Sequence, residues 1–190
     1  MILIPRKVIF VHVPKTGGNS IKKMLTKKTL DHDPNEKDIG HNTMQKIIDY
    51  YPEYSEFRKV FVVRNPYDRI ISFYFYTKKG HKHNSNVFNR DEFLNFLYVE
   101  KKNYLKTQTE RVSVNGKIDT TFMIRFETFE EDVRRVFRDL GIDIKEIPKL
   151  NTTDHEHYSR YLDPELREII TAKFQEDLDN FGYEFKNKRL

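Results

Sequence analysis

The sequence contains no cysteine among its 190 residues. This absence excludes disulfide bonds, a thiolate nucleophile and a zinc site with cysteine ligands, and it leaves the redox compartment open. Glycine and proline are scarce as well, with seven of each, while 37% of the residues are hydrophobic. A chain of this size and composition can bury a core, so we predict a single domain over residues 1–190 that is stabilised by packing alone.

The chain also lacks a hydrophobic run long enough to cross a membrane. The apolar segment near the N-terminus stops at Pro14, which makes it too short for a membrane span or for the apolar part of a signal peptide. We therefore predict no integral membrane segment, no targeting signal and a cytoplasmic location.

Charge of one sign is not in strong excess. There are 34 lysines and arginines against 29 acidic residues, which gives a formal net charge of +5. A mildly basic surface suits an anionic ligand, but the sequence has no compact basic run and no signature of a nucleic-acid module. Nucleic acid is therefore not an expected partner. The sequence predicts neither the oligomeric state nor a binding partner beyond small molecules.

Three apolar runs have the composition of strands buried on both faces of a parallel sheet, at residues 8–13, 60–63 and 122–126. Each is followed by residues at helical spacing, and a further helix is expected after Asp163-Pro164. Strands that alternate with helices predict the α/β class. We expect a three-layer α/β/α sandwich with a mostly parallel sheet, similar in design to P-loop nucleotide kinases, with ligands at the carboxyl ends of the strands.

Several short motifs predict where these elements begin and end. Asn65 before Pro66 is typical of a helix N-cap, and Gly141 is placed to end a helix. Capping boxes are expected at two further helix starts, one from Asn42 to Gln45 and one from Thr128 to Glu131. The dipeptide Asn115-Gly116 predicts a hairpin between short strands at residues 111–114 and 117–118.

The segment from Pro14 to Ser20 has the design of a phosphate-binding loop. A glycine pair between a strand and a helix lets the backbone approach an anion closely, and the helix N-terminus favours negative charge. Lysine adds a positive charge, and hydroxyl and amide side chains add donors. The alternative interpretation is an ordinary connection between a strand and a helix. The candidate ligand-binding residues of this loop are Lys15, Thr16, Gly17, Gly18, Asn19 and Ser20.

The usual nucleoside-triphosphate loop, G-x-x-x-x-G-K-[ST], is not present. Lys15 precedes both glycines, and the second apolar strand ends at Arg64 instead of at an aspartate that could hold magnesium. A magnesium-dependent nucleotide or sugar kinase is therefore disfavoured, and we predict no metal site. The histidines at 81 and 83 fit a solvated loop better than a metal site. A non-catalytic nucleotide- or glycan-binding module stays open as a second alternative.

Two motifs together resemble a known family. The order P-K-T-G-G-N-S at residues 14–20 resembles the 5′-phosphosulfate loop of carbohydrate sulfotransferases that use 3′-phosphoadenosine 5′-phosphosulfate (PAPS). The segment from Val62 to Tyr74 is similar to their 3′-phosphate motif, in which the arginine at the strand end and a serine two turns into the helix hold the 3′-phosphate. These two residues are Arg64 and Ser72 in this chain. Further similarity at residues 125–127 and 177–185 extends the resemblance over most of the sequence.

The resemblance implies an enzyme that transfers a sulfuryl group from PAPS to a hydroxyl of a carbohydrate or glycolipid, without a metal. It assigns Lys15 to stabilise the leaving adenosine 3′,5′-bisphosphate and His41 to serve as general base, where the alternative for His41 is a residue that shapes the start of a helix. The polar loop from Lys78 to Arg90 is a candidate acceptor site.

Three further expectations concern histidines and charges near these motifs. His12 is expected to be a buried structural residue of the first strand. The segment that contains His155 and His157 resembles a family loop that closes over the nucleotide, or it anchors the last helix. Asp68 and Arg69 are expected to form a surface or capping pair.

Overall fold

The computed structural model describes residues 1–3, 6–28, 42–78, 87–99, 105–144, 146–148 and 155–188. The chain divides into two compact units. Unit 1 comprises Met1–Val63 and Gln108–Asn151, and unit 2 comprises Arg64–Thr107 and Thr152–Leu190. The single domain expected over residues 1–190 stays a prediction. No helix in the described part of the chain is long and apolar enough to span a membrane.

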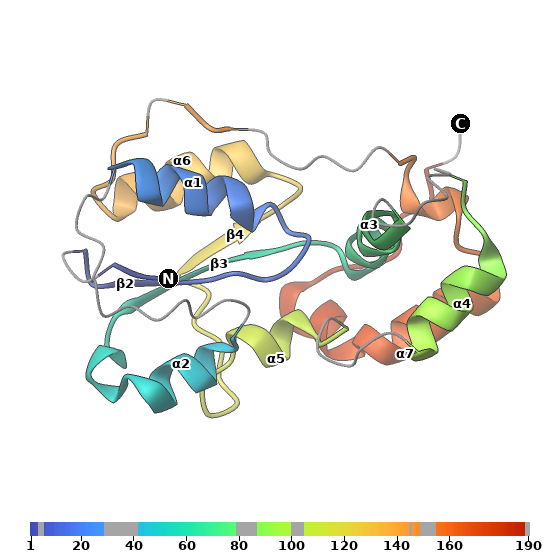
Figure 1. Ribbon diagram of the computed structural model, residues 1–190, viewed down its shortest axis with the longest axis horizontal. Helices are drawn as coiled ribbons and strands as arrows, with labels where there is room; N and C mark the ends of the chain where they lie inside the picture. The colour runs from blue at the N-terminus through green and yellow to red at the C-terminus, as the bar shows by residue number, and fades with distance from the viewer. Residues whose placement is uncertain are drawn as a thin grey trace. The chain divides into compact units, whose positions relative to one another are not determined.

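Unit 1 is built around a four-stranded sheet (Figure 1). The strands lie in the order β1 (Ile2–Leu3), β2 (Val8–Val11), β3 (Arg58–Val63) and β4 (Phe122–Arg125). The last three are parallel, with Phe10 opposite Val60 and Val62 opposite Ile124, and the edge strand β1 is antiparallel. The residues of β2 and the second half of β3 are buried, as expected for strands covered on both faces. The same expectation was wrong for β4, in which only Ile124 is buried.

Helices cover both faces of this sheet. In Figure 1, α1 (Gly18–Lys28) and α6 (Phe129–Asp139) lie on one face, and α2 (Met44–Tyr50) and α5 (Gln108–Val112) lie on the other. A short 3₁₀ turn, η2 (Pro52–Tyr54), connects α2 to β3. This arrangement of helices on a sheet confirms the α/β class and the mostly parallel sheet in three layers.

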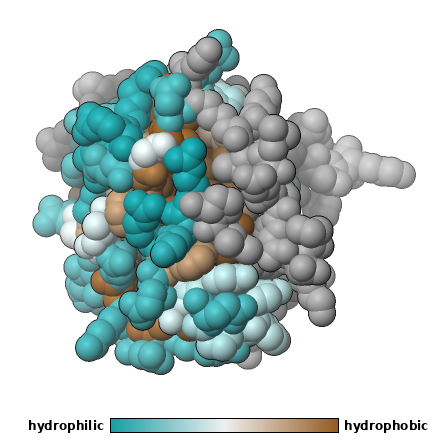
Figure 2. Space-filling model, turned by 90° about the vertical axis from the view of Figure 1, so that its left-hand side faces the viewer, coloured by the Kyte–Doolittle hydropathy of each residue, from teal (hydrophilic) through white to brown (hydrophobic). Residues whose placement is uncertain are grey.

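Figure 2 shows one face of the molecule, where hydrophilic residues predominate and hydrophobic ones are visible between them.

Unit 2 is helical and has an aromatic core. It contains α3 (Pro66–Lys78), α4 (Arg90–Val99), the 3₁₀ turn η3 (Tyr158–Arg160) and α7 (Pro164–Phe181). Tyr74 on α3 packs edge to face against Phe93 and Phe96 of α4, with ring centroids 5.2 and 5.8 Å apart. Buried aromatic and aliphatic side chains of α7 complete the same cluster. This packing holds α3, which carries the predicted site residue Ser72 and directly follows the turn that contains Arg64.

Three of the predicted helix ends are confirmed. The side chain of Asn65 accepts a hydrogen bond from the backbone of Tyr67 at 3.1 Å, and Asp163 caps α7 at Leu166 in the same way at 2.9 Å. Gly141 has φ +70° just beyond the end of α6, a left-handed conformation that glycine adopts easily.

Other local predictions were wrong in detail. The N-cap of α2 is Thr43 and not Asn42, since the Thr43 hydroxyl accepts from the backbone of Lys46 at 3.3 Å. Gln45 instead donates to Asp49 on the next turn at 2.8 Å. Thr128 does precede α6, but its hydroxyl donates to Asp132 at 3.0 Å and no side chain closes a capping box.

The turn at Asn115-Gly116 is present, but the hairpin predicted around it is much shorter. Val114 and Lys117 exchange two backbone hydrogen bonds of 2.9 and 3.0 Å and form an isolated antiparallel bridge. The first half of the strand expected at residues 111–114 is instead the end of α5 (Gln108–Val112), a helix that packs against α2. Tertiary contact has overridden a local preference at this position.

Candidate functional site

The loop between β2 and α1 has a backbone shape that few residues adopt. Both Lys15 and Gly17 have positive φ, at +66° and +82°. Glycine takes this conformation without a steric penalty, but for an L-residue such as lysine it costs on the order of 1 kcal/mol. The surrounding contacts must therefore hold Lys15 in this position.

Buried contacts of the loop account for that constraint. Thr16 is fully buried, and its hydroxyl donates to the carbonyl oxygen of Val13 at 2.8 Å. The backbone of Ser20 donates to Gly17 at 3.0 Å. A Cβ atom at Gly17 would lie only 3.1 Å from the ring of Phe129. The Thr16 hydroxyl proton is used within the loop, so this side chain helps to shape the loop.

His12 supports the loop from the end of β2. It is half-buried and follows the last residue of that strand, so the buried position within the strand expected for it was wrong. A Cβ atom built on Gly18 would lie 2.2 Å from Cδ2 and 2.7 Å from Nε2 of His12. Gly18 is not among the residues with positive φ. It is therefore required for the space that it leaves to the histidine ring, and not for its backbone conformation.

The electrostatic setting of this loop favours an anion. Helix α1 begins at Gly18 and has no acidic residue in its first turn, whereas α6 has three there. The first backbone N–H groups of a helix have no partner within the helix, and they carry partial positive charge. With a lysine three residues before the first helical residue, the loop has the charge and the donors to bind a phosphate or sulfate group.

The turn between β3 and α3 is built from charged and polar side chains. Arg64 directly follows β3 and is only 7% exposed. Its Nε and Nη2 atoms lie 2.8 and 2.7 Å from the same carboxylate oxygen of Asp68. Asn65, besides capping α3, donates through Nδ2 to the carbonyl oxygen of Glu184 at 3.0 Å. A buried guanidinium is thus held in a fixed orientation.

Ser72 lies on the same face of α3 as Asp68, because residues four apart in a helix are neighbours. Its side chain has no exposed surface. Asp68 therefore lies on the α3 face that carries Ser72, and it also contacts Arg64, which precedes the helix.

The expected pair of Asp68 with Arg69 was wrong. Arg69 is buried, donates to the carbonyl oxygen of Lys106 at 2.8 Å and lies over the ring of Phe174 at 5.4 Å. The partner of Asp68 is Arg64, four residues before it, and this spacing was visible in the sequence.

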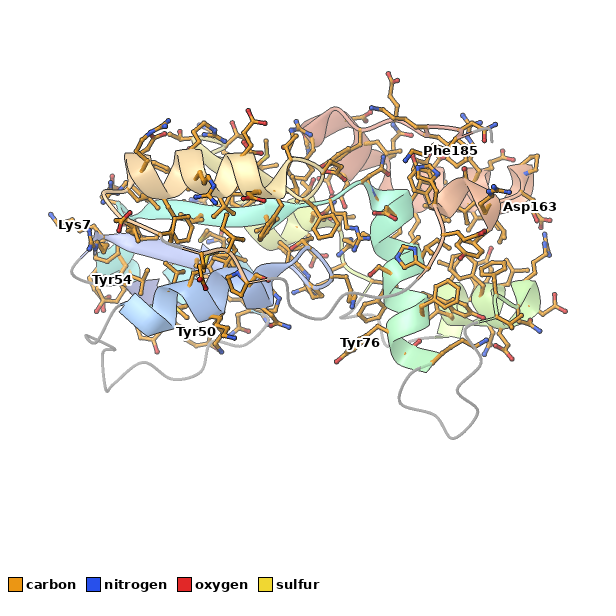
Figure 3. All side chains as sticks on the ribbon, turned by 90° about the horizontal axis from the view of Figure 1, so that it is seen from above. Lys7, Tyr50, Tyr54, Tyr76, Asp163 and Phe185 are labelled. Carbon is orange, nitrogen blue, oxygen red and sulfur yellow. The ribbon has the colours of Figure 1, made fainter. Side chains whose placement is uncertain are left out.

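The segment around His157 anchors the end of the chain to α3. Tyr158 is buried, and its hydroxyl accepts a hydrogen bond from the backbone of Lys186 at 2.8 Å. The rings of Tyr67, Tyr158 and Phe185 lie within 5.8 Å of each other, and Figure 3 shows Phe185 beside the first turn of α3. These contacts favour the anchoring interpretation of this segment over the lid.

The pKa of His157 lies below its ordinary value of 6.5. Burial of the ring is the largest cause, the positive charge of Lys188 adds to it, and the carboxylate of Asp68 opposes both. The Nδ1 atom of His157 accepts from the backbone of Ser159 as the N-cap of η3, at 3.4 Å, which requires the unprotonated nitrogen.

An open groove of about 680 Å³ in unit 2 contains none of the predicted site residues. It is lined mainly by α7, including Arg167 and Thr171, and by Phe185, whose ring lies 4.4 Å from the Arg167 guanidinium. Neither strand-to-helix turn contributes a residue to its lining.

Several predicted residues lie outside the described residues. These are His41, the proposed base, and residues 79–86 of the candidate acceptor loop, with both of its histidines. Among the residues that are described, no three histidine or acidic side chains lie together as ligands for a metal.

Comparison with known proteins gives one result. Residues 4–184 match the family described as the sulfotransferase family. No curated protein and no solved structure matches the chain. The match covers nearly the whole sequence, including both strand-to-helix turns. The chain therefore belongs to the sulfotransferase family, whose members transfer sulfuryl groups.

Proposed function

We propose that this enzyme takes a sulfuryl group from PAPS and transfers it to a hydroxyl of a carbohydrate or glycolipid, releasing adenosine 3′,5′-bisphosphate. The observation that carries the proposal is the loop at Pro14–Ser20, where two positive φ angles, a lysine and a helix N-terminus without acidic residues occur together. We further propose that residues 1–190 act as one sulfotransferase domain, because the family match spans both units.

In this proposal the loop binds the 5′-phosphosulfate. The backbone N–H groups of Gly17, Gly18 and Asn19 lie at the start of α1, and they would donate to the phosphate and sulfate oxygens. The N–H group of Ser20 is bonded to Gly17, so Ser20 is assigned as a ligand through its hydroxyl group. Thr16 contributes by closing the loop through Val13. Lysine is the charged residue of this loop, and its flexible ammonium can follow the charge that develops on the bridging oxygen.

The reaction is an in-line substitution at sulfur. The acceptor oxygen forms a bond to sulfur while the bond from sulfur to the bridging phosphate oxygen breaks, and its electron pair leaves with adenosine 3′,5′-bisphosphate. Lys15 stabilises the charge on that leaving oxygen, and the imidazole of His41 takes the proton of the acceptor hydroxyl. We assign no step to a metal ion.

The 3′-phosphate is assigned to the turn after β3. Arg64 is a buried cation with its plane fixed by Asp68, and arginine suits the geometry of phosphate oxygens. Ser72 is assigned as a second ligand on the same helix face. Because Ser72 has no exposed surface, its contact with a phosphate requires that the side chains around it shift when the nucleotide binds.

The test is calorimetric titration without divalent metal, using adenosine 3′,5′-bisphosphate and, separately, adenosine 5′-monophosphate. We expect tight binding of the bisphosphate and a loss of about 100-fold or more when either the 3′-phosphate or the Arg64 side chain is removed. Arg134→Ala, which removes an exposed arginine of α6, is the matched control. Binding only to ATP with magnesium would reject the proposal in favour of a kinase.

The acceptor class needs its own measurement. Transfer of radiolabelled sulfate from PAPS to a panel of glycans and glycolipids, with simple phenols and amines for comparison, would identify it. We expect label on the carbohydrate hydroxyls. Label only on phenols or amines would leave the donor assignment intact and reject the carbohydrate acceptor.

A further inference from the structure

We propose that His12 is a positioning residue of the phosphosulfate loop, because its ring supports the backbone of Gly18 and thereby places the first N–H groups of α1. This inference rests on the proposed function, since those N–H groups are assigned to the donor. His12 does not itself contact the sulfuryl group in this proposal.

The ring of His12 lies so close to Gly18 that a residue with a Cβ atom would not fit at position 18 without a shift of its neighbours. Three ring atoms of His12 lie 2.2, 2.7 and 3.1 Å from the position of a Cβ atom at Gly18. An approach below 3.0 Å is essentially never observed for a real Cβ atom, so the ring occupies the space of the missing side chain. The first residue of α1 therefore packs directly against the imidazole ring of His12.

The ring is itself anchored. It follows β2, which pairs with β1 on one side and with β3 on the other. It also stacks on Phe10, a residue of the same strand that is 2% exposed, with the ring centroids 6.3 Å apart and an interplanar angle of 21°. A support that rests on the middle of the sheet moves little, because side chains in a packed interior have few alternative positions.

The two adjacent glycines have different physical requirements. Gly17 needs its positive φ and lies against Phe129, whereas Gly18 needs the space that His12 fills. The loop is thus supported under both residues. If the ring is removed, a void opens below the first residue of α1, and the N–H groups are no longer fixed before the nucleotide arrives. A displacement of about 1 Å at such a site can weaken its function by about 100-fold.

The competing explanation is a histidine that stabilises the sheet and has no influence on the loop. It predicts that His12 and Gly18 contribute independently. The proposal predicts that they are coupled, since the methyl group of an alanine at position 18 can occupy the space that His12 leaves when it is also replaced by alanine.

The experiment is a double-mutant cycle with His12→Ala, Gly18→Ala and the double variant, and with His12→Phe as a conservative replacement. The probe is adenosine 3′,5′-bisphosphate in calorimetry, and thermal unfolding is measured in parallel. We expect each single alanine variant to weaken binding by about tenfold or more, His12→Phe to stay close to wild type, and the double variant to bind more tightly than Gly18→Ala. Gly116→Ala is the control, because a Cβ atom there would meet nothing within 4 Å.

Each other outcome decides against the inference. Additive losses in the cycle would show that ring and glycine act separately, and wild-type affinity in His12→Ala would show that no support is needed. If His12→Phe were as weak as His12→Ala, the ring nitrogens and not the ring volume would matter. If wild type bound no nucleotide, the proposed function would fail, while the same cycle in unfolding free energy would still measure the coupling.

Discussion

The turn after β2 contains two glycines and a strained lysine, whereas the turn after β3 contains no glycine and relies on Arg64 and Asn65. In the first turn we propose that the backbone carries the binding groups, and contacts from Thr16 and His12 give the loop its shape. In the second we propose that a side-chain cation is the binding group, and Asp68 gives it its orientation.

The difference matters because the two turns should fail for different reasons. A site made of backbone N–H groups is damaged when a larger side chain is introduced or a supporting one is removed. A substitution does not remove these donors, but it can move them out of position. A side-chain site is damaged by a change in charge, because a buried cation without its carboxylate is costly. The predictions below separate these two sensitivities.

The largest effect is expected for Lys15→Met, which keeps the length of the side chain and removes its charge. We expect the rate of sulfuryl transfer from PAPS to fall by about 100-fold or more, with only a small change in nucleotide affinity, because in the proposed mechanism Lys15 acts on charge that develops during the reaction. Initial rates and calorimetry on the same protein measure the two quantities. Lys46→Ala, an exposed lysine of α2, is the control. An equal loss in affinity would make Lys15 a binding residue only.

Asp68→Asn should have the next largest effect, and on stability. It leaves Arg64 buried without a carboxylate, which we expect to lower the free energy of unfolding by about 1–3 kcal/mol, given that Asp68 is itself 22% exposed. Adenosine 3′,5′-bisphosphate should restore more stability to this variant than to wild type, because the phosphate supplies the missing negative charge. Thermal unfolding with and without the nucleotide gives the comparison. If the nucleotide raised the unfolding temperature of both proteins equally, Arg64 would not be a ligand of the 3′-phosphate.

Gly17→Ala tests the backbone turn. Its positive φ and the ring of Phe129 at 3.1 Å should together cost on the order of 1–2 kcal/mol in unfolding free energy. Gly116→Ala has a similar φ of +72° and no neighbour, so it should show the backbone cost alone. Chemical denaturation of both variants measures the difference. If the two losses were the same, the contact with Phe129 would contribute nothing.

The smallest effect concerns His157. Its pKa is lowered in the folded protein, so the unfolded chain binds protons more readily than the folded one. The stabilisation from the neutral ring is present above the ordinary value of 6.5 and is lost as the pH falls below it towards the lowered pKa. His157→Asn can still cap η3 and does not titrate, so its unfolding free energy should depend less on pH in that window. Parallel curves for both proteins would assign the dependence to another group.

Local signals in the sequence were enough for much of the fold. The three apolar runs became the three parallel strands, and Asn65, Asp163 and Gly141 marked helix ends correctly. These features depend on residues within one turn or strand of each other. The loop at Pro14–Ser20 was found for the same reason, since all its members are neighbours in the chain.

Features that depend on distant partners were missed. The helix α5 forms where a strand was expected, because it packs against α2. His12 was read from its own strand alone, and its contact with Gly18 depends on how the loop returns over the sheet. The pairing of Asp68 with Arg64 could have been predicted from their spacing, but the burial of Arg69 over Phe174 depends on a helix more than a hundred residues later in the chain.

The division of the chain between the units has a consequence for synthesis. The chain passes from one unit to the other after Val63, Thr107 and Asn151. During translation the sheet can be completed once β4 has left the ribosome. The aromatic surface of α3 can pack against α4 soon after both helices are made, but its contacts with α7 form only after the whole second segment of unit 1 has been made. The part of that surface that α7 covers therefore stays exposed during this period, and exposed apolar surface is prone to aggregation.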